Sequence, residues 1–132
     1  MYDGFITKLV FEEDPLVVEL ENFTATGLDG KVQIDWSTAS EINTAGFYIM
    51  RSLSDTGTYT TISPFITARG SVADGAAYTF TDNHVVNGTT YYYMLHEIEL
   101  NMDEYFYGPV FATPGFAKKL KPQTLEQVYQ SR

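Results

Sequence analysis

The stretch that decides the fold is residues 31–52, which read KVQIDWSTASEINTAGFYIMRS. Apolar and polar residues alternate in each half, and this period of two predicts two strands that each have one buried face. The mostly polar residues 39–45 between the halves predict a connecting loop. The positions that the pattern turns toward the core are Val32, Ile34, Trp36, Phe47 and Ile49.

The same alternation recurs on both sides of this stretch, and turn residues separate the runs. Residues 63–76 contain Pro, Ser and Gly, which predicts an irregular excursion over the surface. Short alternating runs at this spacing predict an all-β sandwich of about seven strands over residues 16–114. The other runs are residues 16–25, 59–62, 77–81, 91–100 and 105–113.

The longest run contains a conflict of parity. Its first half turns odd-numbered residues toward the core, whereas the apolar Ile98 and Leu100 have even numbers. Strict alternation would bury Glu97 and Glu99, and burying a carboxylate is costly unless it is paired. We therefore expect a β-bulge near His96 and Glu97, which would return Ile98 and Leu100 to the core.

Two segments of the sequence resemble fibronectin type III domains. Trp36, followed by Gly46-Phe47-x-Ile49-x-Arg51-Ser52, is similar to their B and C strands. The run Val86-Asn87-Gly88-Thr89-Thr90-Tyr91-Tyr92-Tyr93 is similar to their E–F corner and F strand. The resemblance implies an immunoglobulin-like sandwich in which the hydroxyl of Tyr91, as a tyrosine corner, bonds back to the backbone upstream.

A narrower likeness concerns residues 36–47 and Gly108-Pro109-Val110. They look like the fibronectin-type modules near the C-termini of bacterial secreted and surface proteins. This resemblance covers residues 16–114 and implies a non-catalytic part of a longer chain, in an extracellular or cell-envelope protein. It implies no substrate, because sandwiches of this type carry unrelated functions.

The ends of the chain, residues 1–15 and 115–132, match nothing in the family pattern. Residues 5–11 are strand-like, so the N-terminal extension is expected to be a linker or an extra strand, and residues 124–129 could form a short helix in the tail. The N-terminus lacks the basic start and apolar core of a signal peptide, so either the protein is cytosolic or Met1 begins an excised fragment. The resemblance to modules of longer chains favours the fragment.

Composition narrows the classes of partner. A net charge of −9 argues against nucleic acid and anionic membranes as partners. No stretch approaches the 18 apolar residues that a membrane span needs, so membrane insertion is not expected. Residues 1–22 are acidic and residues 116–132 are basic, so the two ends could attract each other between copies, or both could be solvated.

The sequence offers no strong candidate for chemistry, and we expect no catalytic residue, cofactor or metal. The two histidines, His84 and His96, have no partner at metal-ligand spacing, and no Ser lies in a Gly-x-Ser-x-Gly setting. Oxygen atoms near residues 82–87 could bind Ca²⁺, but no EF-hand spacing supports this. The carboxylate pairs Glu97/Glu99 and Asp103/Glu104 are expected to be surface charge.

One candidate surface remains when the core residues are subtracted. Side chains that point away from the core should form an aromatic and methionine patch on the outer face of the C–F–G sheet. Either a terminal segment of the chain covers this patch, or a neighbouring domain or another copy does. The expected patch residues are Tyr48, Met50, Tyr92, Met94 and Tyr107.

Three functions fit this pattern. The first is a structural or adhesive module of a bacterial cell-surface or secreted protein, which acts as spacer and docking surface. The second is a self-assembling subunit of a filament or surface layer that exchanges a terminal strand or tail. The third is an accessory domain of a secreted hydrolase that contacts polysaccharide through exposed tyrosines.

Overall fold

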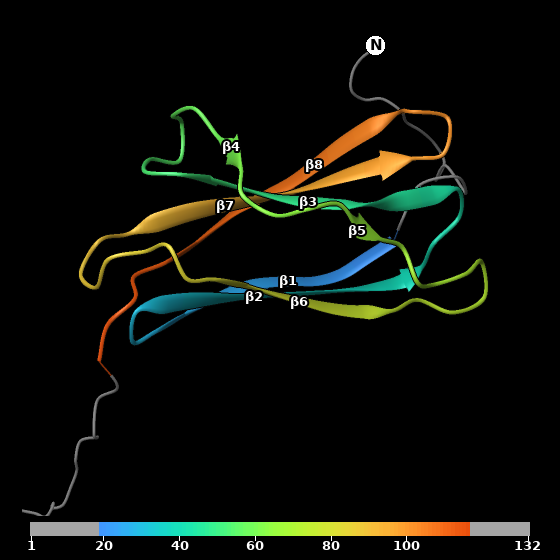
Figure 1. The fold of residues 1–132 in the computed structure, drawn as a ribbon. Helices are drawn as coiled ribbons and strands as arrows, with labels where there is room; N and C mark the ends of the chain where they lie inside the picture. The colour runs from blue at the N-terminus through green and yellow to red at the C-terminus, as the bar shows by residue number, and fades with distance from the viewer. Residues whose placement is uncertain (1–18, 117–132) are drawn as a thin grey trace, which may run out of the picture.

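The computed structural model describes residues 19–116, which form eight strands in two antiparallel sheets and no helix. Figure 1 shows the two sheets stacked as the layers of a sandwich. This confirms the predicted all-β sandwich, although two of the eight strands have only two residues each. The predicted strand at residues 5–11 and the predicted short helix at residues 124–129 lie outside the described residues. Residues 19–116 contain no helix with the length and apolar character needed to cross a membrane.

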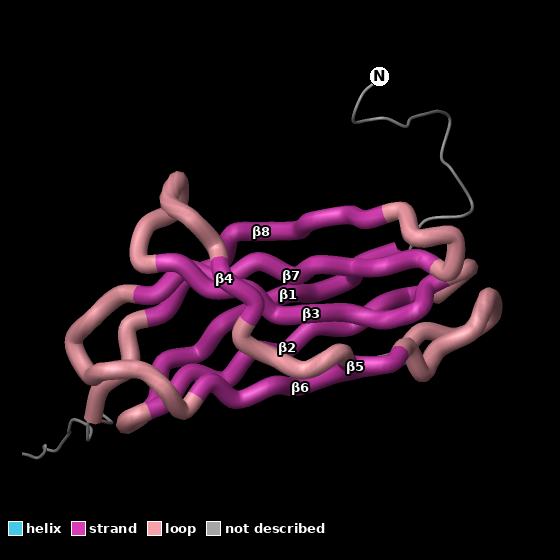
Figure 2. Tube along the Cα trace, turned by 45° about the horizontal axis from the view of Figure 1, so that its top comes forward, coloured by secondary structure: helices cyan, strands magenta, loops and turns pink. Residues whose placement is uncertain are grey.

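The first sheet has three strands in the order β1-β2-β6. The second has the order β4-β3-β7-β8, with β5 also paired to β3, as the tilted view of Figure 2 shows. In chain order the strands are β1 (Glu19–Leu28), β2 (Lys31–Ser40), β3 (Thr44–Ser52), β4 (Thr60–Thr61), β5 (Ile66–Thr67), β6 (Ala77–Asp82), β7 (Tyr91–Glu99) and β8 (Glu104–Ala112).

The core lies between the sheets and contains every residue that the alternation of residues 31–52 turned inward. Trp36 is its centre: its ring stacks on Tyr78 at 5.2 Å between centroids and meets the Phe47 ring edge-on at 5.8 Å. The expected tyrosine corner is also present, because the Val86 amide donates a hydrogen bond to the Tyr91 hydroxyl at 2.9 Å. The buried apolar residues are Val32, Ile34, Trp36, Phe47, Ile49, Tyr78, Tyr91, Tyr93, Leu95 and Ala112.

The β-bulge expected near His96 and Glu97 is wrong. β7 alternates strictly along its whole length, so Glu97 and Glu99 are buried and Leu100 is 68% exposed. Burial of the Glu97 carboxylate is tolerable because it accepts hydrogen bonds from the hydroxyls of Thr44 and Tyr107, both at 3.3 Å. Hydroxyl donors on the neighbouring strands β3 and β8 therefore allow β7 to stay regular, which the pattern of apolar residues alone did not predict.

Pairs of a carboxylate and a tyrosine recur through the interior. Three buried carboxylates each accept a hydrogen bond from a tyrosine hydroxyl that also packs in or against the core. Each pair gives a buried acid a hydrogen-bond donor from within the sandwich. The pairs are Tyr78–Glu41 at 2.7 Å, Tyr93–Asp82 at 2.9 Å and Tyr107–Glu97 at 3.3 Å.

One of these carboxylates also joins the two sheets through an ion pair. Arg51 on β3 donates from Nη1 to both oxygens of Asp82 on β6, at 2.9 and 3.1 Å. Asp82 is almost fully buried, whereas the Arg51 side chain is 26% exposed. The guanidinium also lies 5.5 Å from the Tyr91 ring centroid, so it connects the ion pair to the core.

Arg51→Ala is expected to destabilise the domain by about 2 kcal/mol, because it leaves a buried carboxylate without its cation. The partial exposure of Arg51 places this value below that for a fully buried pair. Arg51→Met with Asp82→Asn should recover part of the loss, since no unpaired charge remains. Urea unfolding followed by circular dichroism gives both values, and a loss below 0.5 kcal/mol for the single variant would contradict a structural role.

Candidate functional site

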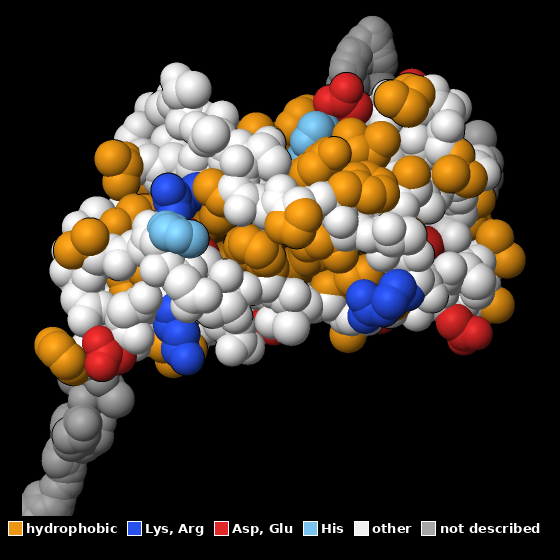
Figure 3. Space-filling view, viewed as in Figure 1, with side chains coloured by type: hydrophobic (Ala, Val, Ile, Leu, Met, Phe, Trp, Pro, Cys, Tyr) orange, Lys and Arg blue, Asp and Glu red, His pale blue; other side chains and the backbone are white. Residues whose placement is uncertain are grey.

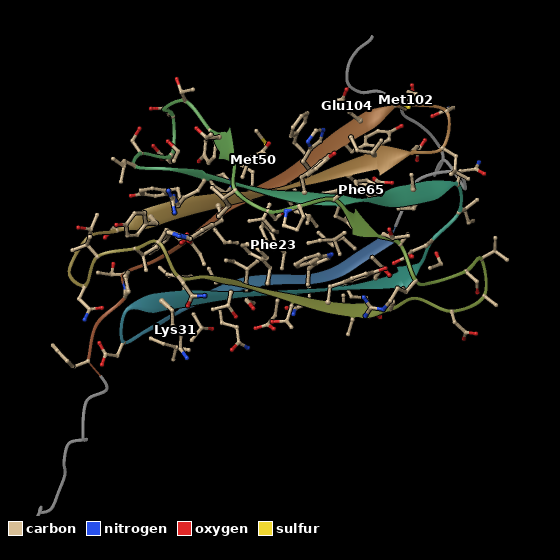
Figure 4. The ribbon with its side chains drawn as sticks, in the orientation of Figure 1. Phe23, Lys31, Met50, Phe65, Met102 and Glu104 are labelled. Atoms are coloured by element: carbon tan, nitrogen blue, oxygen red, sulfur yellow. The ribbon has the colours of Figure 1, made fainter. Side chains whose placement is uncertain are left out.

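The outer face of the second sheet carries four of the five expected patch residues. Tyr48 and Met50 on β3, and Tyr92 and Met94 on β7, are half-buried and alternate with inward-facing neighbours. Figure 4 shows Met50 on the outer side of this sheet, whereas Phe23 lies between the layers. These four residues therefore face outward, as predicted.

The expected outward orientation of Tyr107 is wrong. Tyr107 packs against the core, and its hydroxyl donates to Glu97 inside the sandwich. The cause is one extra residue on β8 at Gly108-Pro109, which reverses the parity of the strand and turns Phe106 and Phe111 outward instead. The pairs that flank the extra residue are Tyr93–Val110 and Leu95–Tyr107.

The outward side chains form three rows that cross the strands. In the first row, Tyr48, His96 and Phe106 lie directly opposite one another on β3, β7 and β8. The second row pairs Met50 with Met94, and the third pairs Tyr92 with Phe111. Ring centroids are 5.8 Å apart between Tyr48 and His96, 4.3 Å between His96 and Phe106, and 5.8 Å between Tyr92 and Phe111.

Phe65 extends the first row from the segment before β5. Its ring meets Tyr48 edge-on at 5.3 Å and lies over Gly46, where a Cβ atom would come within 2.5 Å of the Phe65 ring. Gly46 therefore makes room for Phe65 on the sheet. The sequence placed Phe65 in an irregular segment, so only the glycine before Phe47 could have indicated this contact.

The rows form a surface of exposed aromatic rings with little charge. Phe65, Phe106 and Phe111 are 41%, 51% and 65% exposed. Hydrophobic side chains gather along this upper layer in the space-filling view (Figure 3). His96 of the first row pairs with Glu104, which lies opposite Ile98 beside that row, and the Nε2 and Oε1 atoms of the pair lie 2.8 Å apart. We call this surface, made by the three rows and Phe65, the aromatic face.

The outer face of the first sheet is different in kind. Its outward positions on β1, β2 and β6 carry short polar side chains and a carboxylate in place of rings. Since both faces belong to the same small domain, the contrast shows that the rings are not a general feature of its surface. These positions are Thr24, Thr26, Gln33, Asp35, Ser37, Thr79 and Thr81, with Lys31 and Ala77 at the strand ends.

The residues that the sequence analysis considered as catalytic or metal-binding candidates lie apart from one another in the fold. His84 lies in the exposed loop after β6, and His96 lies in the aromatic face. Glu97 and Glu99 are buried, which corrects their expected place at the surface, whereas Asp103 and Glu104 are exposed in the β7–β8 hairpin. Among residues 19–116, no group of three or more acids and histidines could hold a metal ion.

The side-chain oxygen atoms of Asp82 and Asn87, considered above as Ca²⁺ ligands, stabilise turns and the ion pair with Arg51. Asp82 binds Arg51 and accepts from the His84 amide, while the Asn87 side chain accepts from the Gly30 amide and donates to Asp29.

A shallow groove of about 360 Å³ lies between the edges of the two sheets. The Arg69 guanidinium lies 4.3 Å from the Tyr78 ring centroid there and donates to the carbonyl oxygen of Ala77. Burial and the hydrogen bond to Glu41 raise the pKa of Tyr78 to about 12, so this hydroxyl stays protonated and structural at neutral pH. The remaining lining residues are Asp35, Ile66 and Thr79.

Comparison with known proteins supports the fold. No family model and no curated protein sequence matches the chain. Among solved structures, an Fn3-like protein from Clostridium thermocellum is similar, with a TM-score of 0.54 and 20% identity over 80% of this chain and 97% of that one. Pectate lyase Pel3 from Pectobacterium carotovorum is also similar, with a TM-score of 0.50 and 19% identity over 74% of this chain and 28% of the lyase.

The strand order places β3, β7 and β8 side by side as the C, F and G strands of an immunoglobulin-like sandwich, and the tyrosine-corner residue Tyr91 begins β7, as it does near the start of strand F in that fold. Residues 19–116 therefore form a fibronectin type III-like β-sandwich.

Proposed function

We propose that the chain is a non-catalytic spacer and docking module of a bacterial cell-surface or secreted protein, and that it docks through the aromatic face. The observation that carries this proposal is the exposure of the Phe106 and Phe111 rings in rows that lack unpaired charge. Contiguous apolar patches of this kind are uncommon on free monomers and tend to mark contacts. The Fn3-like neighbour, most of whose length this chain spans, fits a self-contained module.

The arrangement of the buried acids favours contact over catalysis. Glu41, Asp82 and Glu97 each accept a hydrogen bond from a tyrosine inside the sandwich. A general acid or base has to reach the proton that it transfers in a substrate. Carboxylates enclosed in the sandwich and bound to tyrosine hydroxyls stabilise the domain and are not placed to reach a substrate.

If Phe111 serves contact and not folding, Phe111→Thr should change the free energy of unfolding by less than about 1 kcal/mol, the range of one cross-strand pair. The same variant should elute earlier from a phenyl column, because it removes a ring that is 65% exposed. Thr81→Ala on the other outer face is the control and should leave the elution unchanged. A loss of stability above 2 kcal/mol, or unchanged elution, would refute the proposed docking surface.

A polysaccharide contact is the second candidate function. It is favoured by the exposed rings together with the structural neighbour whose name is pectate lyase. Pull-down on insoluble neutral and acidic polysaccharides tests it, with Tyr48→Ala and Tyr92→Ala as the variants. Retention of the wild-type chain that both variants reduce would support a glycan partner, and no retention would remove it.

A further inference from the structure

We infer that the aromatic face packs against the same face of a second copy of this chain, as a two-fold symmetric dimer. This inference rests on the proposed docking function and names its partner. It is carried by the order of the rows, the orientation of the rings, the distribution of charge and the size of the face.

The order of the rows makes the face complementary to itself. Rigid rings form the first and third rows, and flexible methionines form the second, which β8 passes at the irregular Gly108-Pro109. Successive rows lie about 6.7 Å apart, because alternate residues of a strand share a face. A two-fold axis along the rows, between the first and second, sets the first row of each copy over the methionine row of the other. It sets the third row over the next outward positions of the other copy, Ile98 and Glu104. Methionine side chains can adapt to the rings that they meet.

The orientation of the rings favours a protein partner over a sugar. His96 and Phe106 lie opposite each other on adjacent strands, and their rings are within 12° of parallel at 4.3 Å. Rings this close and this parallel must be stacked, so their faces turn toward each other along the sheet and their edges point outward. A sugar ring stacks on an aromatic face, whereas projecting edges fit between the side chains of a second sheet, as in a sandwich interior.

The distribution of charge permits two copies of an acidic chain to meet here. The chain has a net charge of −9, yet the three rows contain no carboxylate. Glu104, which lies opposite Ile98 beside the first row, binds His96 of that row. Other acids of the described residues lie in the first sheet, in loops or inside the sandwich. Charge repulsion between copies is therefore smallest at the aromatic face.

The size of the face suits a weak dimer. Three rows about 6.7 Å apart, on β3, β7 and β8 with Phe65 beside them, give a surface of about 20 Å by 20 Å. In projection this is about 400 Å², about half of the roughly 800 Å² of accessible surface that each partner buries in a stable interface, so we expect association near the upper end of the concentration range tested.

Sedimentation equilibrium of the full chain between micromolar and millimolar concentration tests the inference. The wild-type chain should reach twice its mass of 14.9 kDa. Phe106→Lys should weaken association at least 10-fold, and Thr81→Lys, the same charge change on the other outer face, less than 2-fold. Phe111→Lys provides a second variant at an exposed site, and circular dichroism verifies that each variant folds.

Salt and cross-linking separate this dimer from other outcomes. Association should persist or strengthen in 1 M NaCl, because salt screens the repulsion between acidic bodies and leaves apolar contact intact. The chain has no cysteine, so Met94→Cys with a short bismaleimide should give a cross-linked dimer and Thr79→Cys should not.

Three results would overturn the inference. A wild-type chain that stays monomeric at millimolar concentration does not form this dimer. The elution of Phe111→Thr from the phenyl column then tests the proposed docking surface independently of the dimer. Assembly that Phe106→Lys leaves intact and that 1 M NaCl dissolves would assign the contact to the oppositely charged chain ends. A monomer that is retained on polysaccharide would assign the face to a glycan.

Discussion

Trp36→Ala is expected to lower the free energy of unfolding by about 3–5 kcal/mol, the range for large aromatic side chains removed from a core. Trp36 is 1% exposed and contacts rings from both sheets, Tyr78 of β6 and Phe47 of β3. Its loss would leave a cavity at the junction of the two layers. Urea unfolding followed by far-ultraviolet circular dichroism measures the effect without depending on the fluorescence of the chain's one tryptophan.

Trp36→Phe is the matched control and should cost about 1–2 kcal/mol, because the phenyl ring keeps much of the stacking. The indole Nε1 is buried and has no hydrogen-bond partner among the described residues, so phenylalanine loses no polar interaction. Equal losses in the two variants would mean that a polar contact, and not packing, makes Trp36 important. A near-neutral Trp36→Ala would show that the packing seen around Trp36 does not carry stability.

The core was predictable from the sequence because its strands alternate without interruption. Alternate residues of a strand share a face, so Val32, Ile34 and Trp36 all point into the core. Phe47 and Ile49 on the next strand point inward for the same reason. The outward direction of their neighbours on β3 follows from the same period of two. A residue's face is thus readable wherever the strand stays regular.

Two features could not be read because distant residues decide them. The inward direction of Glu97 depends on hydroxyls of Thr44 and Tyr107, which lie 53 and 10 residues away in the chain. On β8, the extra residue at Gly108-Pro109 reverses the parity between Tyr107 and Ala112. The Gly-Pro pair is a local signal for such an irregularity, and it would have exchanged Tyr107 for Phe106 in the candidate face.

The tyrosine–carboxylate pairs predict a loss of stability at high pH. Burial, and then the hydrogen bond to Glu41, raise the pKa of Tyr78 from 10.0 to about 12. Burial also raises the pKa of Tyr93 and of Tyr107 above the ordinary value, with further increases from Asp82 and Glu97. In each case the neighbouring carboxylate opposes a second negative charge inside the sandwich.

The sign follows from the direction of these pKa shifts. A tyrosine whose pKa is higher in the folded protein contributes stability that is complete below pH 10 and is lost as the pH rises through its folded value. For Tyr78 alone the loss is about 2 kcal/mol by pH 12. While all three tyrosines titrate only in the unfolded chain, the free energy of unfolding falls by about 4 kcal/mol per pH unit. The domain should therefore unfold cooperatively between pH 10 and 12.

Absorbance at 295 nm and circular dichroism, recorded together in an alkaline titration, measure this effect. Tyr78, Tyr93 and Tyr107 should ionise only as the strands unfold, so the last part of the tyrosinate signal should coincide with the loss of structure. Tyr78→Phe should reduce the dependence of stability on pH by about a third, because one of the three groups no longer titrates. If every tyrosine ionised near pH 10 in a folded domain, the hydroxyls would not be held between the sheets, and the buried acids would lack the donors that make their burial tolerable.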